Sequence, residues 1–251
     1  MAPTGASLMA KRAPGDLADR AEPERRVSVF DSSADRYDAW YDTPTGHAVF
    51  AAERAALEPL LTALPRPWIE VGVGGGRFAS ALEVPYGVDP SAAALALARR
   101  RGIETMIARG EELPLEDGVA GAVLLVVTLC FVDDPLRVLR EARRALRPDG
   151  GIVLGLVPAD GPWGRHYRAL GAAGHAYYAR ARFFTREDLR DLLTAAGLEA
   201  RRFRSALFWQ PDGAPLPEEP RDRDDRSAGF LALLAVPGSD SRATAETHRR
   251  R

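Results

Sequence analysis

The stretch WIEVGVGGGRF, residues 68–78, decides the fold. It begins as a short apolar strand, breaks into glycines and continues into residues that suit a helix. The glycines are Gly72, Gly74, Gly75 and Gly76. Because glycine has no Cβ, such a turn lets the backbone approach a ligand closely. The dinucleotide fingerprint G-x-G-x-x-G would need glycine where Arg77 stands, and the pattern is instead E-x-G-x-G-x-G, beginning at Glu70.

Strand-like and helix-like segments alternate along the chain through residue 157, which is typical of a parallel sheet with helices on both faces. The strands are expected at 68–73, 86–88, 105–108, 119–131, 152–157, 198–208 and 229–236. The helices are expected at 47–63, 77–82, 92–101, 133–146 and 185–196. We therefore predict an α/β fold with a Rossmann-like, seven-stranded, mostly parallel sheet whose last strand is antiparallel. In such sheets ligands bind beyond the carboxyl ends of the strands.

One domain accounts for the length of 251 residues. Residues 1–26 are rich in Ala, Pro, Arg and Asp and are expected to form a disordered leader, and 237–251 a disordered tail. The domain between them is expected to span 27–236. Within it, 27–63 is predicted to form an N-terminal lid and helix, and the glycine- and aromatic-rich segment 158–184 an irregular insertion on the substrate side.

The composition narrows the classes of function. The formal net charge of −1 gives no basic field for nucleic acid, and no apolar run reaches the roughly 20 residues that span a bilayer. The single cysteine, Cys130, excludes an intrachain disulfide and a multi-cysteine cluster, and the four histidines lack metal-ligand spacing. We expect a metal-free cytoplasmic protein, monomeric or homodimeric, that binds neither nucleic acid nor membrane.

Two stretches together resemble a known family. The E-x-G-x-G-x-G pattern resembles motif I of the class I S-adenosylmethionine (SAM) methyltransferases. Residues 109–157, RGEELPLEDGVAGAVLLVVTLCFVDDPLRVLREARRALRPDGGIVLGLV, resemble the type 11 family. There an E-x-L-P-hydrophobic stretch leads into the fourth strand, and a helix and a Pro–Gly turn lead to the fifth. The resemblance covers about residues 28–208 and implies a SAM-dependent methyltransferase that acts on a small-molecule acceptor.

A finer resemblance lies in TLCFVDDP at 128–135 and ARFFTREDL at 181–189. These phrases are similar to a bacterial and archaeal subgroup, some members of which are labelled histamine methyltransferase-like. The resemblance does not extend to that substrate.

The parts of SAM suggest roles for the residues of the glycine turn and the next strand. The turn, with Gly72, Gly74 and Gly76, would bring backbone close to the amino-acid end and the ribose. Glu70 would anchor the ammonium group through water or backbone neighbours. Asp89 ends the second strand, and the two oxygens of its carboxylate suit the ribose diol. Because Pro-Ser and a helix follow, Asp89 is alternatively a helix N-cap.

The adenine loop departs from the family pattern, because Arg109 and Gly110 stand where many members have an acid followed by alanine. Gly110 can still offer its N–H to an adenine nitrogen. Arg109 cannot accept from the exocyclic amine, although it can stack on the ring. Glu111 either takes over the acceptor role or is a solvated loop acid. Thr128 is expected beside the methyl group, at the mouth of the fourth strand.

The acceptor side offers few candidates for proton transfer. His166 lies just past the fifth strand and is either a general base or a packing histidine. Cys130 is expected in the substrate pocket as a buried strand residue rather than a nucleophile. Aromatic side chains are expected to form a lid that excludes water, or alternatively to pack in the core. They are Tyr37, Trp40, Tyr41, Trp163, Tyr167, Tyr177 and Tyr178.

Two other functions stay open at this point. An NAD-dependent oxidoreductase is opposed by Arg77 and by the absence of any lysine after Lys11, which rules out a Tyr-x-x-x-Lys couple. A non-catalytic binding or regulatory protein of methyltransferase fold is compatible with the motifs, because a fold does not guarantee an activity.

Overall fold

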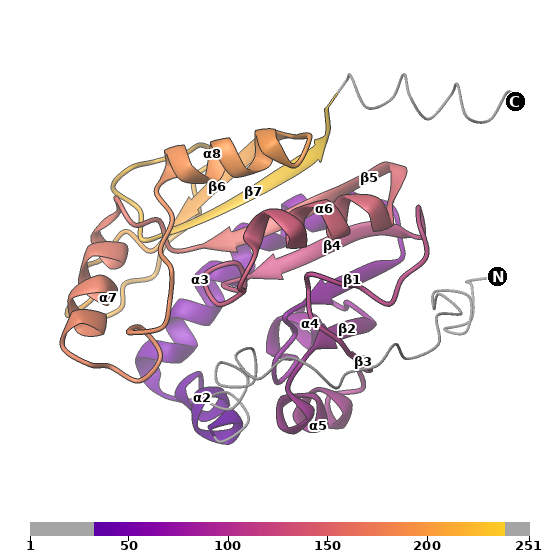
Figure 1. Ribbon diagram of the computed structural model, residues 1–251. Helices are drawn as coiled ribbons and strands as arrows, with labels where there is room; N and C mark the ends of the chain where they lie inside the picture. Colours follow the sequence, from indigo (N-terminus) through magenta and orange to yellow (C-terminus); the bar gives the residue numbers. More distant parts are fainter. Residues whose placement is uncertain (1–32, 239–251) are drawn as a thin grey trace, which may run out of the picture.

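Seven strands form one sheet in the computed structural model, which describes residues 33–238 (Figure 1). Residues 1–32 and 239–251 lie outside the described part, and with them the predicted leader 1–26 and nearly all of the predicted tail. The strands are β1 (Trp68–Val71), β2 (Tyr86–Asp89), β3 (Glu104–Ile107), β4 (Ala120–Val126), β5 (Leu146–Leu156), β6 (Leu198–Ala206) and β7 (Phe230–Pro237). The helices are α2 (Ala34–Trp40), α3 (Pro44–Leu61), α4 (Arg77–Ala81), α5 (Ala92–Arg100), α6 (Pro135–Ala145), α7 (Pro162–Ala172) and α8 (Arg186–Ala195).

The strand order β3-β2-β1-β4-β5-β7-β6 confirms the predicted fold class. The first five strands pair in parallel, and β7 inserts antiparallel between β5 and β6. The order reverses between β1 and β4, because the chain starts near the middle of the sheet, moves to one edge and returns to the other side of β1. Such a switch point leaves a crevice at the carboxyl ends of the two central strands.

Helices cover both faces of the sheet, and each face has its own core. Leu57 and Leu60 of α3, Phe78 of α4 and Leu95 of α5 belong to one cluster. The other cluster contains residues of α6 and α8, which lie together on the opposite side of the sheet in Figure 1. All seven residues of β4 are buried, as expected for a central strand covered on both faces. None of the described helices is long and apolar enough to span a membrane.

The apolar run at 119–131 was predicted as one strand, and this prediction is wrong in its second half. The strand ends at Val126, and Val127 takes a left-handed φ of +50° that turns the chain out of the sheet. A β-branched residue rarely adopts this conformation. The residues after the turn remain apolar because they line cavities, and an apolar run does not distinguish a buried strand from a cavity wall.

The segment 158–184 was predicted as irregular, but it contains the helix α7. Its glycines suggested turns. Gly174 does lie in a turn, with a φ of +90°, but two others are positions where backbone comes close: a Cβ on Gly164 would stand 2.0 Å from the carbonyl oxygen of Pro158, and one on Gly171 would stand 2.6 Å from that of Tyr178. The predicted cap of the next helix is confirmed, because Thr185 and Asp188 form a capping box at the start of α8.

Candidate cofactor and acceptor site

The glycine turn after β1 is held open by left-handed backbone. Gly72, Gly74 and Gly76 have φ angles of +75°, +51° and +79°. The Gly72 N–H donates to the carbonyl of Val88 at 2.8 Å, which ties the turn to β2. A Cβ on Gly72 would lie 2.3 Å from Cγ2 of Thr128, so glycine there lets the turn and the end of β4 meet.

Glu70 lies at the buried floor of this turn, with 2% of the residue exposed. Burial raises the pKa of its carboxyl well above the ordinary value, although a hydrogen bond from the backbone N–H of Ala79 acts in the opposite direction. Its Oε2 has no hydrogen-bond partner among the described residues. A buried acceptor with unused capacity suits a ligand that supplies a donor.

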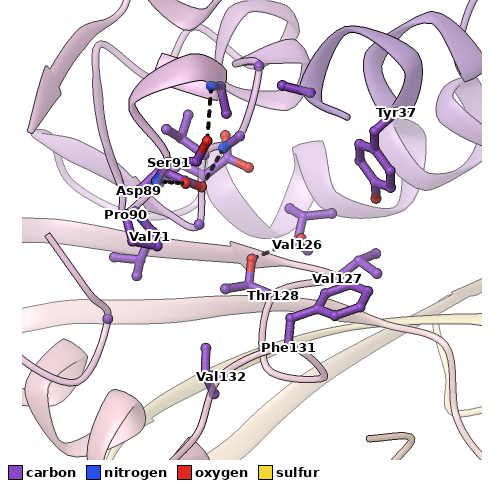
Figure 2. A pocket seen from close by; sticks show the side chains of 18 of the residues that line it. Tyr37, Val71, Asp89, Pro90, Ser91, Val126, Val127, Thr128, Phe131 and Val132 are labelled. Atoms are coloured by element: carbon purple, nitrogen blue, oxygen red, sulfur yellow. Dashed lines mark hydrogen bonds between the residues drawn. The ribbon is translucent and has the colours of Figure 1, made fainter. Parts of the chain in front are cut away.

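Asp89 lies at the end of β2 and connects the turn to the following loop (Figure 2). Its Oδ2 accepts the N–H of Gly74 at 2.9 Å, and its Oδ1 accepts the N–H of Ser91 at 2.8 Å. Ser91, and not Asp89, is the N-cap of α5, and its hydroxyl accepts the N–H of Ala94. The helix-cap interpretation of Asp89 is therefore wrong. Each carboxylate oxygen can accept more than one hydrogen bond, so both can also face a diol.

A cavity of about 190 Å³ opens between these residues. Seven of the eight predicted cofactor-binding residues line it, namely Glu70, Gly72, Gly74, Asp89, Gly110, Glu111 and Thr128. The eighth, Gly76, does not. Its left-handed backbone forms the N-cap of α4, and a Cβ there would stand 3.0 Å from Ala98, so Gly76 serves helix packing.

An ionic group forms the far wall of this cavity. Arg109 pairs with Glu111 at 3.5 Å and with Asp133. Oε1 of Glu111 also accepts the backbone N–H of Asp133 at 3.0 Å and that of Asp134 at 3.3 Å. With 12% of its side chain exposed, Glu111 is not a solvated acid but ties the loop before β4 to the start of α6.

The helix α2 is clamped over the cavity by charges that the sequence did not reveal as a group. Asp38 accepts hydrogen bonds from Arg77 at 2.9 Å and from both terminal nitrogens of Arg101, at 2.9 and 2.7 Å. Arg101 also donates to the carbonyl of Gly75. Burial alone would raise the pKa of Asp38, but the hydrogen bonds from Arg101 and Arg77 outweigh burial and lower it.

A second cavity of about 430 Å³ adjoins the first. Six residues line both cavities: Tyr37, Tyr41, Val127, Thr128, Phe131 and Tyr177. Figure 2 shows Tyr37 reaching from its helix toward the wall formed by Val126, Val127 and Thr128. The predicted pocket residues Trp40, Cys130 and Tyr167 line the second cavity. Burial raises the pKa of the Cys130 thiol to about 12, so at neutral pH it is not a thiolate nucleophile.

Two predicted acceptor-side residues lie elsewhere. Trp163 is not among the residues that line either cavity; it is buried and donates from Nε1 to the carbonyl of Trp209 at 2.9 Å. His166 does not line them either, and its Nδ1 stands 3.6 Å from the carboxylate of Asp212. Both residues are on α7, whose helical rotation turns them away from the second cavity while Tyr167 faces it.

Comparisons with known proteins agree with this geometry. The model of a family described as "Methyltransferase domain" matches residues 69–154. A crystal structure from Thermotoga maritima, described as a SAM-dependent methyltransferase and possible histamine N-methyltransferase, is 32% identical with a TM-score of 0.77. The alignment covers 84% of this chain and 99% of that one. The chain belongs to the SAM-dependent methyltransferases, class I, type 11.

Other relatives extend the similarity. The methyltransferase is 44% identical over 219 residues to an uncharacterised protein of Mycobacterium tuberculosis, covering 87% of this chain and 76% of the relative. It is 30% identical over 232 residues to malonyl-[acyl-carrier protein] O-methyltransferase of Geobacter sulfurreducens. That alignment covers 81% of this chain and 84% of the relative. Because the chain belongs to the SAM-dependent methyltransferases, its cofactor is SAM, and the NAD alternative is set aside. The unpartnered Oε2 of Glu70 and the open space beside Gly74 fit a ligand with an ammonium donor.

The clamp on α2 gives a first prediction. Replacing Asp38 with asparagine removes its charge beside Arg77 and Arg101, so α2 should open more readily over the bound cofactor. We expect SAM to dissociate roughly fivefold to tenfold faster, because loss of a partly buried ion pair acts mainly on the dissociation rate. Stopped-flow fluorescence during displacement by S-adenosylhomocysteine measures this rate.

The control for this prediction is Asp42→Asn. Asp42 pairs with the same Arg77 at 2.9 Å, but 67% of its side chain is exposed. Exposed ion pairs contribute little, so we expect its dissociation rate within about twofold of wild type. Equal rates for the two variants would show that Asp38 does not hold α2 closed.

Proposed function

We propose that this methyltransferase moves the methyl group of SAM to a small-molecule acceptor bound in the second cavity, by in-line displacement. One observation carries the proposal. The cavity lined by the glycine turn and Asp89 shares a wall of six residues with a larger, mostly apolar cavity, and Thr128 lies in that wall. The shared wall is the boundary that a transferred methyl group would cross.

The residues of the first cavity have matching roles in the proposal. Asp89 binds the ribose diol, the turn with Gly72 and Gly74 brings backbone to the amino-acid end, and Glu70 serves the ammonium group. Gly110 offers its N–H to the adenine. SAM supplies an activated methyl group, and the protein orients the acceptor toward it.

Exclusion of water supports the reaction. In the proposal, the described part of the N-terminal segment, residues 33–63, acts as a lid through α2, and the segment 158–184 covers the acceptor side. Tyr37 and Tyr41 line both cavities, and burial raises the pKa of each hydroxyl far enough that both remain neutral. Alignment of two reactants in a dry cavity supplies much of the acceleration of such a displacement.

Blocking the second cavity tests the proposal. Cys130 lines only that cavity, so Cys130→Phe should fill the acceptor space and leave the cofactor cavity intact. We expect transfer of tritium from methyl-labelled SAM to a panel of amines, phenols, thiols and carboxylates to fall at least about tenfold. The SAM affinity of Cys130→Phe, measured by calorimetry, should stay within about twofold of wild type. The control variant Cys130→Ser should retain both the methyl transfer and the SAM affinity.

Three outcomes would count against the proposal. Wild-type protein that binds SAM and labels no small molecule would favour the non-catalytic alternative. Transfer that survives in Cys130→Phe would place the acceptor elsewhere. Failure of the wild-type protein to bind SAM or S-adenosylhomocysteine would remove its basis.

A further inference from the structure

A carboxyl group in the second cavity has no hydrogen-bond or ion-pair partner within the described part of the chain. Glu53 lies on α3, is 3% exposed, and lines this cavity but not the cofactor cavity. No hydrogen bond or ion pair found within residues 33–238 involves its carboxyl group, and burial raises its pKa to about 8. Buried carboxyl groups are normally paired, so an unpaired one beside an open cavity points to a ligand.

Four tyrosines that line the same cavity interact electrostatically with this carboxyl. Burial raises the pKa of four tyrosine hydroxyls, and the nearby charge of Glu53 raises each further. The four are Tyr37, Tyr41, Tyr167 and Tyr178. Tyr37 and Tyr41 belong to α2 and its C-cap, Tyr167 belongs to α7, and the rings of Tyr167 and Tyr178 stack at 4.2 Å. Aromatic faces around a carboxylate form an environment that favours a cation.

The mouth of the cavity has the opposite charge. The cations Arg36 and Arg182 line the cavity and are exposed, as is the imidazole of His175, and Arg36 lies 5.9 Å from the centre of the Tyr177 ring. A ligand with one positive group can therefore place it inside, whereas a second positive group at the mouth would be repelled. An anionic acceptor would be repelled by the Glu53 carboxylate, and a neutral acceptor would offer it a hydrogen bond but no compensating charge.

We propose, on the basis of the function proposed above, that the acceptor is a monoamine and that Glu53 binds its ammonium group and takes the proton from it. The ammonium nitrogen has no lone pair until one N–H bond breaks and the proton moves to the Glu53 carboxylate. The freed lone pair then forms the bond to the methyl carbon, and the electrons of the broken carbon–sulfur bond stay on sulfur. The products are a methylated ammonium ion and neutral S-adenosylhomocysteine, and the proton on Glu53 returns to solvent.

Calorimetry on the protein saturated with S-adenosylhomocysteine tests the binding part. The probes are phenethylamine and 2-phenylethanol, which have similar shapes and differ in charge. We expect the amine to bind wild type at least about tenfold more tightly than the alcohol. Because Glu53 is mainly protonated at pH 7, amine binding should release nearly one proton, measured by comparing buffers of different ionisation enthalpy.

The variants are Glu53→Gln and its matched control Glu58→Gln, on the same helix at a half-buried position where 47% of the side chain is exposed. Glu53→Gln should lose both the preference for the amine and the proton release, and Glu58→Gln should keep both. Binding of S-adenosylhomocysteine should be unchanged in wild type and both variants. Loss of this binding would contradict the proposed function, and not the role of Glu53. Equal binding of alcohol and amine, no amine binding at millimolar concentration, or a Glu53→Gln variant that still prefers the amine would overturn the proposal.

Stability gives an independent readout. The raised pKa of Glu53 means that ionisation disfavours the folded state, starting above the ordinary value of 4.5 and growing until about pH 8. Methyl transfer to phenethylamine should fall at least about tenfold in Glu53→Gln. The melting temperature of this variant should be about that of wild type at pH 4.5 and several degrees higher than that of wild type at pH 8. A variant that is less stable at pH 8 would show that Glu53 has a structural role instead.

Discussion

Replacing Asp89 with alanine is expected to weaken SAM binding by at least about tenfold. The carboxylate already accepts the N–H groups of Gly74 and Ser91 through different oxygens, so it fixes the glycine turn against the end of β2. We infer that it also accepts from the ribose diol. Hydrogen bonds to a charged group contribute roughly 1.5–3 kcal/mol each, and about 1.4 kcal/mol corresponds to a factor of ten in affinity. Calorimetric titration with SAM measures the change.

Two further variants separate binding from folding. Ser91→Ala removes the N-cap hydroxyl of α5 and keeps the backbone N–H that Asp89 accepts, so it should cost about 1 kcal/mol of stability and weaken SAM binding less than Asp89→Ala does. Asp89→Asn keeps one acceptor oxygen and should fall between wild type and alanine. Wild-type affinity in Asp89→Ala would mean that the carboxylate only holds the loop together.

The sequence was sufficient to predict the sheet and to name most of the residues that meet at the first cavity, because both depend on local signals. A run of glycines directly after a strand indicates a turn with left-handed backbone. An acid at the end of the next parallel strand is expected to lie beside that turn. Gly76 has the same backbone conformation but faces α5, and no local pattern separates a glycine needed for ligand approach from one needed for packing.

The residues that line the second cavity could not be assigned from the sequence, because tertiary contacts decide which side chains face it. Glu53 is an acid in an alanine-rich helix, and its burial follows from how α3 packs beneath the second cavity. His166 and Trp163 are close in sequence to the fifth strand, and the rotation of α7 decides that Tyr167 faces the cavity instead. Their neighbours are distant in the chain, so spacing alone could not assign them.

The second large effect is expected at Gly72, where alanine would disrupt the boundary between the cavities. The left-handed φ of +75° costs a residue with a Cβ about 1–2 kcal/mol. The new Cβ would also stand 2.3 Å from Cγ2 and 2.4 Å from Oγ1 of Thr128, which must shift. We expect a loss of roughly 3 kcal/mol in unfolding free energy by chemical denaturation. Methyl transfer should fall about a hundredfold, because displacement of Thr128 misplaces the reacting groups.

Gly74→Ala is the matched control for the stability effect, because its φ of +51° is also left-handed but no atom lies within 4 Å of an added Cβ. It should lose only about 1 kcal/mol. The double variant Gly72→Ala with Thr128→Ala removes the two nearest colliding atoms and leaves Cβ of Thr128 at 2.9 Å, so it should regain part of the lost stability. Coupling between the two substitutions is the signature of direct contact. Equal stability losses for the two glycine variants, or strictly additive effects in the double variant, would contradict this prediction. They would show that backbone strain alone requires glycine at position 72 and that the placement of Thr128 does not depend on Gly72.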